Sequence, residues 1–240
     1  MKHLIDIHNH CLPNVDDGAD SIEETLEILR SEYEQGIRDV IVTPHYKKPG
    51  RGRTKKEIRQ VISSIQDALR KEHIDIHLHI GCELFYSSRC IEYLQKDIVA
   101  TLADSKYVLV EFYPDEDYRK IREGIYELVA AGYRPILAHV ERYDSLASID
   151  KVIEVIELGA SIQVNADAVL GKEGIRVAWY VHKLLKNHLV HFVATDAHDS
   201  KKRKPRLLEC EKSLEKKYGI QYAEELCILN PKRILNQRME

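Results

Sequence analysis

Histidine and carboxylate side chains stand together at the ends of several short apolar runs in this sequence, which has 12 histidines in 240 residues. Imidazole and carboxylate donors, with no thiolate among them, suit Mn, Zn or Fe better than a closed structural zinc site. Clustered carboxylates repel one another unless cations lie between them, which points to a multinuclear metal site. Nine candidate donors are too many for one ion, whereas two or three ions fit. The nine are His8, His10, Asp17, His45, Glu83, Glu111, His139, Asp196 and His198.

The charge of such a site indicates the kind of substrate that it would take. Three divalent ions against four carboxylates leave a net charge of about +2, which favours an anion such as phosphate. Two bridged ions could clamp a phosphoryl group and lower the pKa of a bound water toward neutrality, which gives a hydroxide nucleophile. The remaining histidines are interpreted as structural or solvent-facing: His3, His73, His77, His79, His182, His188 and His191.

Seven short runs rich in β-branched residues alternate with longer amphipathic stretches, the pattern of βα units. Function in a parallel barrel collects where strands end and loops begin, and six of the seven runs end in His, Asp or Glu. No Gly-rich phosphate turn follows the first run, so a seven-stranded, mostly parallel barrel is favoured over an open doubly wound sheet. The predicted strands cover residues 4–8, 40–43, 74–80, 107–112, 135–140, 161–165 and 191–195.

Helical stretches with recognisable starts lie between the predicted strands. Ser21 with Glu24, and Thr54 with Glu57, are typical of capping boxes, in which hydroxyl and carboxylate satisfy each other's free backbone amides. Gly36 supplies a stop for the first helix. Further helices are predicted over residues 123–131, 149–158 and 177–185.

Length and composition favour one α/β domain over residues 1–240. No Pro-, Gly- or Ser-rich linker interrupts the chain, and 44% hydrophobic with 31% charged residues is an ordinary globular balance. The 36 basic and 39 acidic residues give a formal charge of −3, so no overall positive field points to nucleic acid. The apolar runs are too short for a membrane span, and the start lacks the apolar region of a signal peptide. A cytoplasmic protein is expected, and the oligomeric state is left open.

The five cysteines indicate neither a disulfide framework nor a catalytic thiol. Their number is odd and no short paired spacing occurs, which suits reduced thiols. None begins the Cys-x5-Arg loop of a cysteine-dependent phosphatase. Cys227 has Arg233 at the sixth position, but the residues between them lack the glycines of a phosphate cradle.

Two basic loops and three tyrosines fall near the predicted rim of the barrel. The basic loops, residues 47–56 and 201–206, are either solvated surface or attract a phosphorylated, often acidic tail. Tyr46, Tyr86 and Tyr113 could flank an aromatic substrate ring or simply pack.

Five motifs follow one another along the chain in a recognisable order. They are Ile5-Asp-Ile-His-Asn-His10, Val15-Asp-Asp-Gly18, Thr43-Pro-His45, His139-Val-Glu-Arg-Tyr143 and Asp196-Ala-His198. Together they resemble the PHP (polymerase and histidinol phosphatase) superfamily. More closely, the chain is similar to the bacterial manganese-dependent protein-tyrosine phosphatases of capsule and exopolysaccharide operons. The resemblance covers essentially the whole chain at the spacing of that family.

This resemblance implies a distorted (β/α)7 TIM-like barrel of the PHP fold with three metal ions. Mn²⁺ is the expected metal, and Zn²⁺, Fe or Mg²⁺ are alternatives. The implied ligands of a first ion are His8, His10, Glu83 and Asp196. A second ion would share Glu83 and add Glu111 and His139, and a third would take Asp17, His45 and His198.

The resemblance also implies two arginines that hold the phosphate. Arg142, in the His-Val-Glu-Arg motif, matches one of them. The second falls on Arg203, five residues after the late Asp-x-His. Because Asp199 and Lys204 stand where the family commonly has Asn and Pro, Arg206 or a neighbouring lysine is left open as a substitute.

The implied function is hydrolysis of phosphotyrosine in a protein by a metal-activated hydroxide. The expected partner is the tail of a bacterial tyrosine kinase that regulates capsule or exopolysaccharide synthesis. Two alternatives stay open: a small-molecule phosphatase of the histidinol-phosphate type, which would want an enclosed pocket, and a non-catalytic, metal-bound regulatory module. No ligand position is missing from the set, which speaks against the second alternative.

Overall fold

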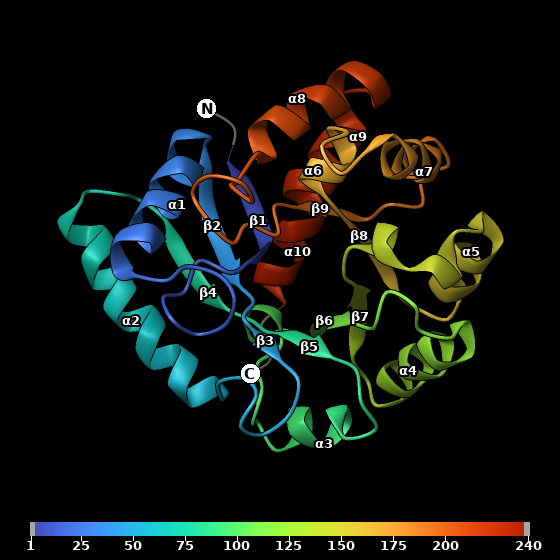
Figure 1. The fold of residues 1–240 in the computed structure, drawn as a ribbon, viewed down its shortest axis with the longest axis horizontal. Helices are drawn as coiled ribbons and strands as arrows, with labels where there is room; N and C mark the ends of the chain where they lie inside the picture. Colours follow the sequence, from blue (N-terminus) through green and yellow to red (C-terminus); the bar gives the residue numbers. More distant parts are fainter. Residues whose placement is uncertain (1–2, 238–240) are drawn as a thin grey trace.

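A curled sheet of parallel strands forms the centre of the structure, a computed structural model that describes residues 3–237 (Figure 1). Hydrogen bonding divides the sheet into two parts, with the orders β1-β2-β4 and β3-β5-β6-β7-β8-β9. Every pair of neighbouring strands is parallel. The strands are β1 Leu4–Asn9, β2 Ile37–Val42, β3 His45–Tyr46, β4 His77–Ile80, β5 Glu83–Phe85, β6 Tyr107–Glu111, β7 Arg134–Leu137, β8 Ser161–Asn165 and β9 Phe192–Ala194.

Backbone hydrogen bonds outside the ladders join the two parts of the sheet. Asn9 forms an isolated parallel bridge with Ala197, and the His10 amide donates to the Ala197 carbonyl over 2.9 Å. On the other side, the Glu83 amide donates to the Thr43 carbonyl over 3.3 Å. The result is a single domain of TIM type with a distorted, half-barrel sheet.

Helices cover the outside of the curled sheet (Figure 1). They are α1 Ile22–Glu34, α2 Lys55–Lys71, α3 Cys90–Gln95, α4 Tyr118–Ala130, α5 Ile149–Glu157, α6 Ala166–Val169, α7 Ile175–Lys186, α8 Leu207–Tyr218, α9 Ile220–Glu224 and α10 Asn230–Asn236. Short 3-10 turns occupy Leu102–Asp104, Val140–Arg142 and Asp144–Leu146, and a π-helical turn occupies Glu225–Leu229. Across residues 3–237, no helix has the length and apolarity needed to cross a bilayer.

Each of the seven predicted runs contains a strand, but several boundaries differ. β2 starts earlier than the predicted run 40–43. The run 74–80 becomes a strand only at His77, because the Ile74 amide still donates to the Leu69 carbonyl (3.0 Å) at the end of α2. The run 135–140 leaves the sheet before His139, since this residue takes a left-handed φ of 33° and leads into a 3-10 turn.

Two strands and the C-terminal helices escape prediction from the sequence. β3 and β5 are two and three residues long, and each begins with a candidate ligand, His45 or Glu83. These two strands are therefore too short to show the alternation of polar and apolar residues that identifies a strand in a sequence. The short helices α3 and α6, like the C-terminal α8, α9 and α10, match no predicted helix, and none of these five helices has a side-chain cap hydrogen bond. The three other predicted helices correspond to α4, α5 and α7, with α4 beginning before the predicted residue 123.

The predicted helix starts at Ser21 and Thr54 are confirmed, with one correction. Thr54 and Glu57 form the reciprocal capping box that the sequence predicts. The Ser21 hydroxyl accepts from the Glu24 amide over 3.2 Å, but the Glu24 carboxylate accepts from the Asp20 amide (2.9 Å) and not from Ser21. The first predicted box is therefore only half formed, because the carboxylate binds the amide one residue earlier.

A buried polar cluster ties α1 to β1. The side-chain amide of Asn9 donates to Glu32 Oε1 over 2.6 Å and to Asp6 Oδ2 over 2.9 Å. The Thr195 hydroxyl also donates to Asp6 Oδ2, over 2.6 Å. Glu32 and Asp6 are fully buried. Burial, followed by the nearby charge of Asp6, raises the pKa of Glu32 well above its ordinary value. Glu32 therefore holds its proton to higher pH in the folded protein than in the unfolded chain.

Replacing Glu32 by Gln should stabilise the protein more as the pH rises. A raised folded-state pKa means that the stability from Glu32 is fully present below the unfolded pKa of about 4.3 and is lost as pH rises toward the folded pKa. Gln keeps the oxygen that accepts from Asn9 but carries no proton to lose. We expect a gain of about 1 kcal/mol or more above pH 7, which corresponds to about 2–4 °C in Tm.

Thermal melts of both proteins between pH 5 and pH 9, at one metal concentration, measure this gain. Glu34→Gln is the matched control, because Glu34 is exposed on the same helix. A Tm difference that stays constant or shrinks with rising pH would show that Glu32 is ionised in the folded state.

Candidate metal centre

A cavity of 250 Å³ opens where the strands of the sheet end, and all nine predicted donor residues gather around it. His8 and His10 lie at its base with their rings fully buried. The other seven line the cavity together with Arg142 and Arg203: Asp17, His45, Glu83, Glu111, His139, Asp196 and His198.

The hydrogen bonds of His8 and His10 determine which ring nitrogen is free. Gln163 Oε1 accepts from the His139 amide over 2.9 Å, so His8 Nδ1, 3.1 Å away, must donate to it. His10 Nδ1 donates to Asp16 Oδ2 over 2.7 Å. With one proton on each ring, both Nε2 atoms carry free lone pairs, and these two atoms lie only 3.1 Å apart.

Two carboxylate oxygens complete this convergent group. Glu83 Oε2 lies 3.3 Å from both Nε2 atoms, and Asp196 Oδ1 lies 3.4 Å from that of His8 and 3.5 Å from that of His10. Four donor atoms this close repel one another unless protons or a metal ion lie among them. Donors around one ion with bonds of about 2.1 Å lie about 3.0–3.4 Å apart, close to the spacing of these four atoms. The four residues therefore fit a metal ion.

Glu83, the first residue of β5, lies at the centre of the cluster. Its Oε1 is 2.8 Å from His139 Nε2, and its Oε2 is 2.9 Å from His45 Nδ1. Glu111, at the end of β6, lies 3.5 Å from His139 Nε2 and 3.9 Å from His45 Nδ1. His45, Glu83 and Glu111 form a second group whose donor atoms are close enough to share an ion, with His139 beside them.

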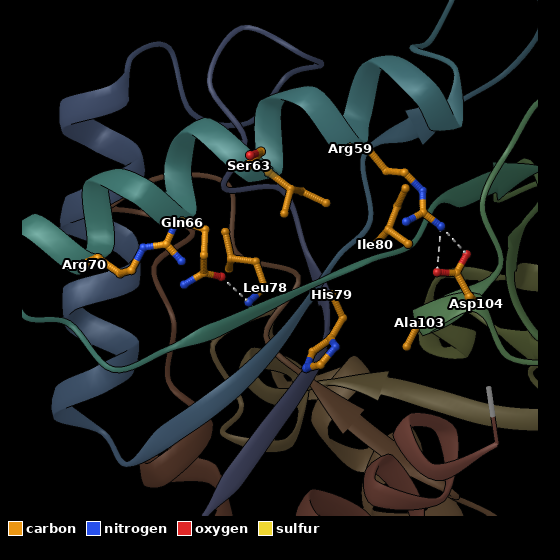
Figure 2. A pocket seen from close by; sticks show the side chains of 10 residues that line it. Arg59, Ser63, Gln66, Arg70, Leu78, His79, Ile80, Ala103 and Asp104 are labelled. Carbon is orange, nitrogen blue, oxygen red and sulfur yellow. Dashed lines mark hydrogen bonds and ion pairs between the residues drawn. The ribbon is translucent and has the colours of Figure 1, made fainter.

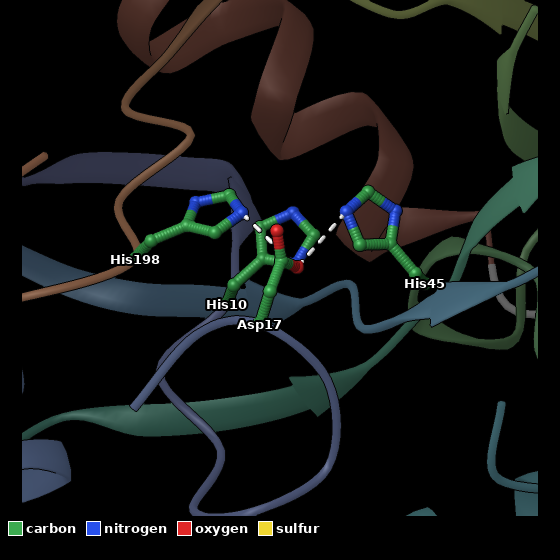
Figure 3. A group of neighbouring side chains, drawn as sticks. All are labelled: His10, Asp17, His45 and His198. Atoms are coloured by element: carbon green, nitrogen blue, oxygen red, sulfur yellow. Dashed lines mark ion pairs between the residues drawn. The ribbon is translucent and has the colours of Figure 1, made fainter. Parts of the chain in front are cut away.

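A third group lies nearer to solvent and contains His10, Asp17, His45 and His198 (Figure 3). Asp17 Oδ1 lies between two rings, 3.3 Å from His45 Nε2 and 3.7 Å from His198 Nε2. His198 Nδ1 donates to the Asp196 carbonyl over 2.9 Å, which leaves a lone pair on Nε2. That Nε2 atom is buried and has no hydrogen-bond partner among the described residues. A cation would satisfy it.

These groups overlap more than the ligand sets implied by the resemblance. His8, His10 and Asp196 lie together as in the first implied set, with Glu83 close by. His45 belongs to two groups, through Nδ1 in one and Nε2 in the other. The division of the nine residues among separate ions stays a prediction.

The carboxylates draw positive charge into the cavity. Burial lowers the pKa of three histidines, but hydrogen bonds to neighbouring carboxylates outweigh it and raise the pKa of His10 to about 9, that of His139 to about 10 and that of His45 to about 11. The rings of His198 and then His45 beside Asp17 hold the pKa of its carboxyl far below its usual range. Protons can supply this positive charge, and so can divalent cations, so metal affinity should fall as pH is lowered.

The loop that carries Asp17 packs tightly against the end of β1. A Cβ at Gly18 would lie 1.9 Å from the His10 carbonyl oxygen, so only glycine fits there. Asp16 accepts from the His10 ring and, over 3.0 Å, from the His45 amide. The role of Asp16 was not recognised in the sequence, where its only signal is its place beside Asp17 in the Asp-Asp-Gly motif.

Two further polar residues of the site were missed in the sequence. Gln163 and Asn165 occupy alternate positions of β8, are buried, and bond one another over 2.9 Å. Gln163 orients His8, and the Asn165 side chain donates to Asp196 Oδ2 over 2.9 Å. Polar side chains at alternate positions of an otherwise apolar run were the available signal.

Left-handed backbone places two of the nine residues. His139 has a φ of 33° and Asp196 a φ of 50°, a region that costs a non-glycine residue about 1–2 kcal/mol. The turn at His139 is closed by the Arg142 amide, which donates to the His139 carbonyl over 2.9 Å. One strained turn therefore brings both a candidate ligand and a candidate phosphate-binding arginine into the cavity.

Arg142 and Arg203 converge on one oxygen of Asp196. Their Nη2 atoms lie 2.9 Å and 3.0 Å from Asp196 Oδ2. Arg206 instead donates to both oxygens of Asp167, over 2.8 Å and 2.6 Å, and does not line the cavity. Of the two arginines that the sequence leaves open, the structure thus brings Arg203 to the site.

Of the three tyrosines predicted near the rim, Tyr113 alone lines the cavity. Tyr46 is buried with its ring centroid 5.6 Å from that of Tyr93, and the buried Tyr86 donates its hydroxyl to Glu127 over 2.7 Å. The rim position expected for Tyr46 is wrong because it follows His45 in a strand, where successive side chains point to opposite sides. Tyr86 is likewise turned into the core.

A second cavity, of 380 Å³, lies outside the sheet between α2 and β4 (Figure 2). Its arginines are already paired with carboxylates: Arg59 bonds Asp104 over 2.8 Å, and Arg70 bonds Asp67. None of the nine predicted donors lines it. It therefore has neither the metal donors nor the free cationic groups that a phosphate site needs.

Comparison with known proteins identifies relatives of the whole chain. Residues 4–236 match the family of capsular polysaccharide synthesis, CpsB/CapC. The tyrosine-protein phosphatase CpsB of Streptococcus pneumoniae is 32% identical over 242 residues, which span 98% of this chain and 100% of the relative. The tyrosine-protein phosphatase YwqE of Bacillus subtilis (strain 168) is 33% identical over 217 residues, 90% of this chain and 85% of the relative.

Two solved structures resemble the fold of this chain to different degrees. A structure from the pair YwqE of Bacillus subtilis and CpsB of Streptococcus pneumoniae, which are metal-dependent tyrosine phosphatases, superposes with a TM-score of 0.92 at 31% identity and covers 98% of this chain and 95% of its own. Histidinol phosphate phosphatase of Lactococcus lactis, solved with zinc, L-histidinol and phosphate, has a TM-score of 0.60 at 15% identity over 92% of this chain and 93% of its own. The second likeness shows the fold alone.

Proposed function

Because this chain belongs to the CpsB/CapC family of capsular polysaccharide synthesis, we propose that it acts on the phosphotyrosine tail of a bacterial tyrosine kinase. In this proposal the kinase regulates capsule or exopolysaccharide synthesis. The chain is a metal-dependent tyrosine-protein phosphatase with a PHP-like fold. One observation carries the chemistry. Buried nitrogen and carboxylate oxygen atoms of His8, His10, Glu83 and Asp196 converge on one point, beside two guanidinium groups.

In this proposal the nine histidine and carboxylate residues hold two or three divalent ions, and Mn²⁺ is the native metal. Divalent ions bound there polarise phosphoryl oxygens and lower the pKa of water toward neutrality. Mixed imidazole and carboxylate donors without thiolate suit Mn²⁺, and also Zn²⁺, Fe or Mg²⁺. Gln163 and Asp16 hold the rings of His8 and His10 with Nε2 directed inward, which orients both lone pairs for an ion.

Arg142 and Arg203 bind the phosphoryl oxygens in this proposal. The planar guanidinium group can donate two parallel hydrogen bonds to a phosphate, which a lysine cannot reproduce. Such donors stabilise the transition state most when they are already in place as charge moves onto the phosphoryl oxygens. Asp196 orients both groups before substrate arrives, because one of its oxygens accepts from each.

The shape and charge of the cavity support a protein substrate. Its 250 Å³ is below the roughly 300–1,000 Å³ of pockets that enclose whole small molecules. It therefore suits one modified side chain presented by a larger chain. Lys47 and Arg203, one from each predicted basic loop, line the cavity and favour an acidic tail. Five buried cysteines, none of them in a disulfide, are consistent with the reducing cytoplasm that we propose as its location.

Activity on a phosphotyrosine peptide should be lost with a chelator, return with Mn²⁺, and resist thiol reagents. Removing the ions removes the Lewis acid, whereas no cysteine takes part in the proposed chemistry. Burial raises the pKa of the thiols of Cys11, Cys82 and Cys210 well above the ordinary value, so they are poor nucleophiles. Initial rates before and after chelation, metal addition and alkylation measure the three responses.

Cys82 deserves its own control because it precedes Glu83 in the chain. If alkylation stops turnover in the native protein but not in Cys82→Ser, the reagent acts by bulk beside the ligands. Loss of turnover in both proteins, with metal content unchanged, would reopen a cysteine-based reaction. Full activity of the chelated protein would contradict the proposed metal chemistry.

A further inference from the structure

Two aromatic side chains form one wall of the cavity, above the candidate metal ligands. Phe85 is the last residue of β5 and Tyr113 lies just beyond the end of β6. Their ring centroids are 4.4 Å apart with the planes at 64°, an edge-to-face pair. Tyr113 is 54% exposed, whereas the neighbouring Phe112 is buried. Its exposed surface belongs to the same cavity as the metal donors.

The position of this wall follows from strand alternation. Glu83 and Phe85 are two residues apart in β5, and Glu111 and Tyr113 are two residues apart along β6 and its continuation. Side chains two residues apart on a strand point to the same side, about 6–7 Å further along. Each strand therefore carries a carboxylate toward the candidate ions and an aromatic ring one step farther out. An aryl group that extends out of the cavity from a phosphate at the ions would pass along this wall.

Lys47 contacts the Phe85 ring of this wall. Its ammonium nitrogen lies 5.2 Å from the centroid of the Phe85 ring, within the range of a cation–π contact. Phe85 is thus in contact with a cation and with the Tyr113 ring, which restricts its motion. A rotationally restricted ring loses little entropy when another ring packs against the wall.

We propose that Phe85 and Tyr113 form the subsite that receives the aromatic ring of phosphotyrosine and so make this enzyme prefer aryl to alkyl phosphates. The inference rests on the proposed function of the same cavity. The side chain of phosphoserine has no aromatic ring and so cannot pack against Phe85 and Tyr113. An aromatic contact of this kind increases binding affinity roughly ten-fold.

The test compares metal-loaded wild type and Tyr113→Ala on two peptides of one sequence, carrying phosphotyrosine or phosphoserine. We expect the ratio of kcat/KM for phosphotyrosine over phosphoserine to fall on the order of ten-fold, mostly through KM for the phosphotyrosine peptide. Tyr113→Phe should keep the wild-type ratio because it keeps the ring. Phe85→Leu, which retains apolar bulk without a ring, should lower the ratio in the same direction.

Tyr126→Ala is the matched control, because Tyr126 is 62% exposed on α4 and does not line the cavity. It should leave both rates unchanged. An unaltered ratio in well-folded Tyr113→Ala and Phe85→Leu would overturn the aryl subsite while leaving the phosphatase function in place.

A binding measurement separates the subsite from turnover. Calorimetry on the metal-loaded protein compares phenylphosphonate with methylphosphonate. Wild type should bind phenylphosphonate about ten-fold more tightly, and Tyr113→Ala should lose this preference. Equal affinity of wild type for the two phosphonates would overturn the subsite. Preferred binding of phenylphosphonate without hydrolysis of either peptide would instead count against the proposed function.

Discussion

Glu83→Gln should lower kcat on a phosphotyrosine peptide on the order of 10³-fold or more, and the purified protein should contain less metal than wild type. Glu83 is buried at the centre of the donor cluster, and its two oxygens lie 2.8–3.3 Å from nitrogens of four histidines. Gln has the same shape but no charge, and one of its oxygens becomes an amide that cannot donate a lone pair. A residue in contact with two groups of donors should affect more than one ion.

Elemental analysis and steady-state kinetics at saturating Mn²⁺ measure both effects. Asp17→Asn is the comparison, because Asp17 contacts only the third group and its side chain is 66% exposed. We expect Asp17→Asn to lose less metal than Glu83→Gln. If the two variants lose equal amounts, Glu83 does not serve more than one ion. If Glu83→Gln keeps wild-type metal content and rate, Glu83 is not a ligand.

Arg142→Ala should lower kcat/KM on the order of 10²-fold, about 3 kcal/mol, while fold and metal content stay as in wild type. The guanidinium group of Arg142 already lies in the cavity, 2.9 Å from Asp196, and can donate two hydrogen bonds to a phosphoryl group. Arg142→Lys should restore only part of the rate, because an ammonium group donates as a point charge. Arg203→Ala should act in the same direction with a smaller effect, because Lys202 lies beside it in the chain.

Arg206→Ala is the matched control, because Arg206 binds Asp167 outside the cavity. The structural alternative is that Arg142 only pairs with Asp196, and Arg142 is 35% exposed. Such a pair would contribute to stability and nothing to turnover. Wild-type kcat/KM in metal-loaded Arg142→Ala would therefore remove Arg142 from the phosphate site.

The donor residues were predictable from the sequence because parallel strands end at one rim. His8, Glu111 and Asp196 each stand at or just beyond the end of a strand, so their convergence follows from the topology alone. The same reasoning recognised His45 and Glu83 without recognising that each begins a short strand. To predict that donor residues gather at one rim, only the end of each apolar run must be located, and these ends can be identified in the sequence.

The residues that orient the donors were not predictable in the same way. Gln163 binds His8 across 155 positions of sequence, and no local pattern records such a contact. The left-handed turn at His139 was hidden because the apolar run continues through it to Val140. The direction of the Tyr46 ring depends on a two-residue strand that propensity does not detect. Long-range pairing and backbone strain decide these details.

The meeting of Arg142 and Arg203 on Asp196 Oδ2 links two binding events through shared partners. A phosphate that enters the cavity shares the N–H donors of both guanidinium groups with this carboxylate oxygen. A cation near Asp196 Oδ1 takes over part of the charge that the arginines compensate and so frees them for the phosphate. By thermodynamic reciprocity, the phosphate must in turn tighten the hold on that cation. We therefore expect a phosphorylated chain and a metal ion to strengthen each other's binding through the carboxylate of this one aspartate.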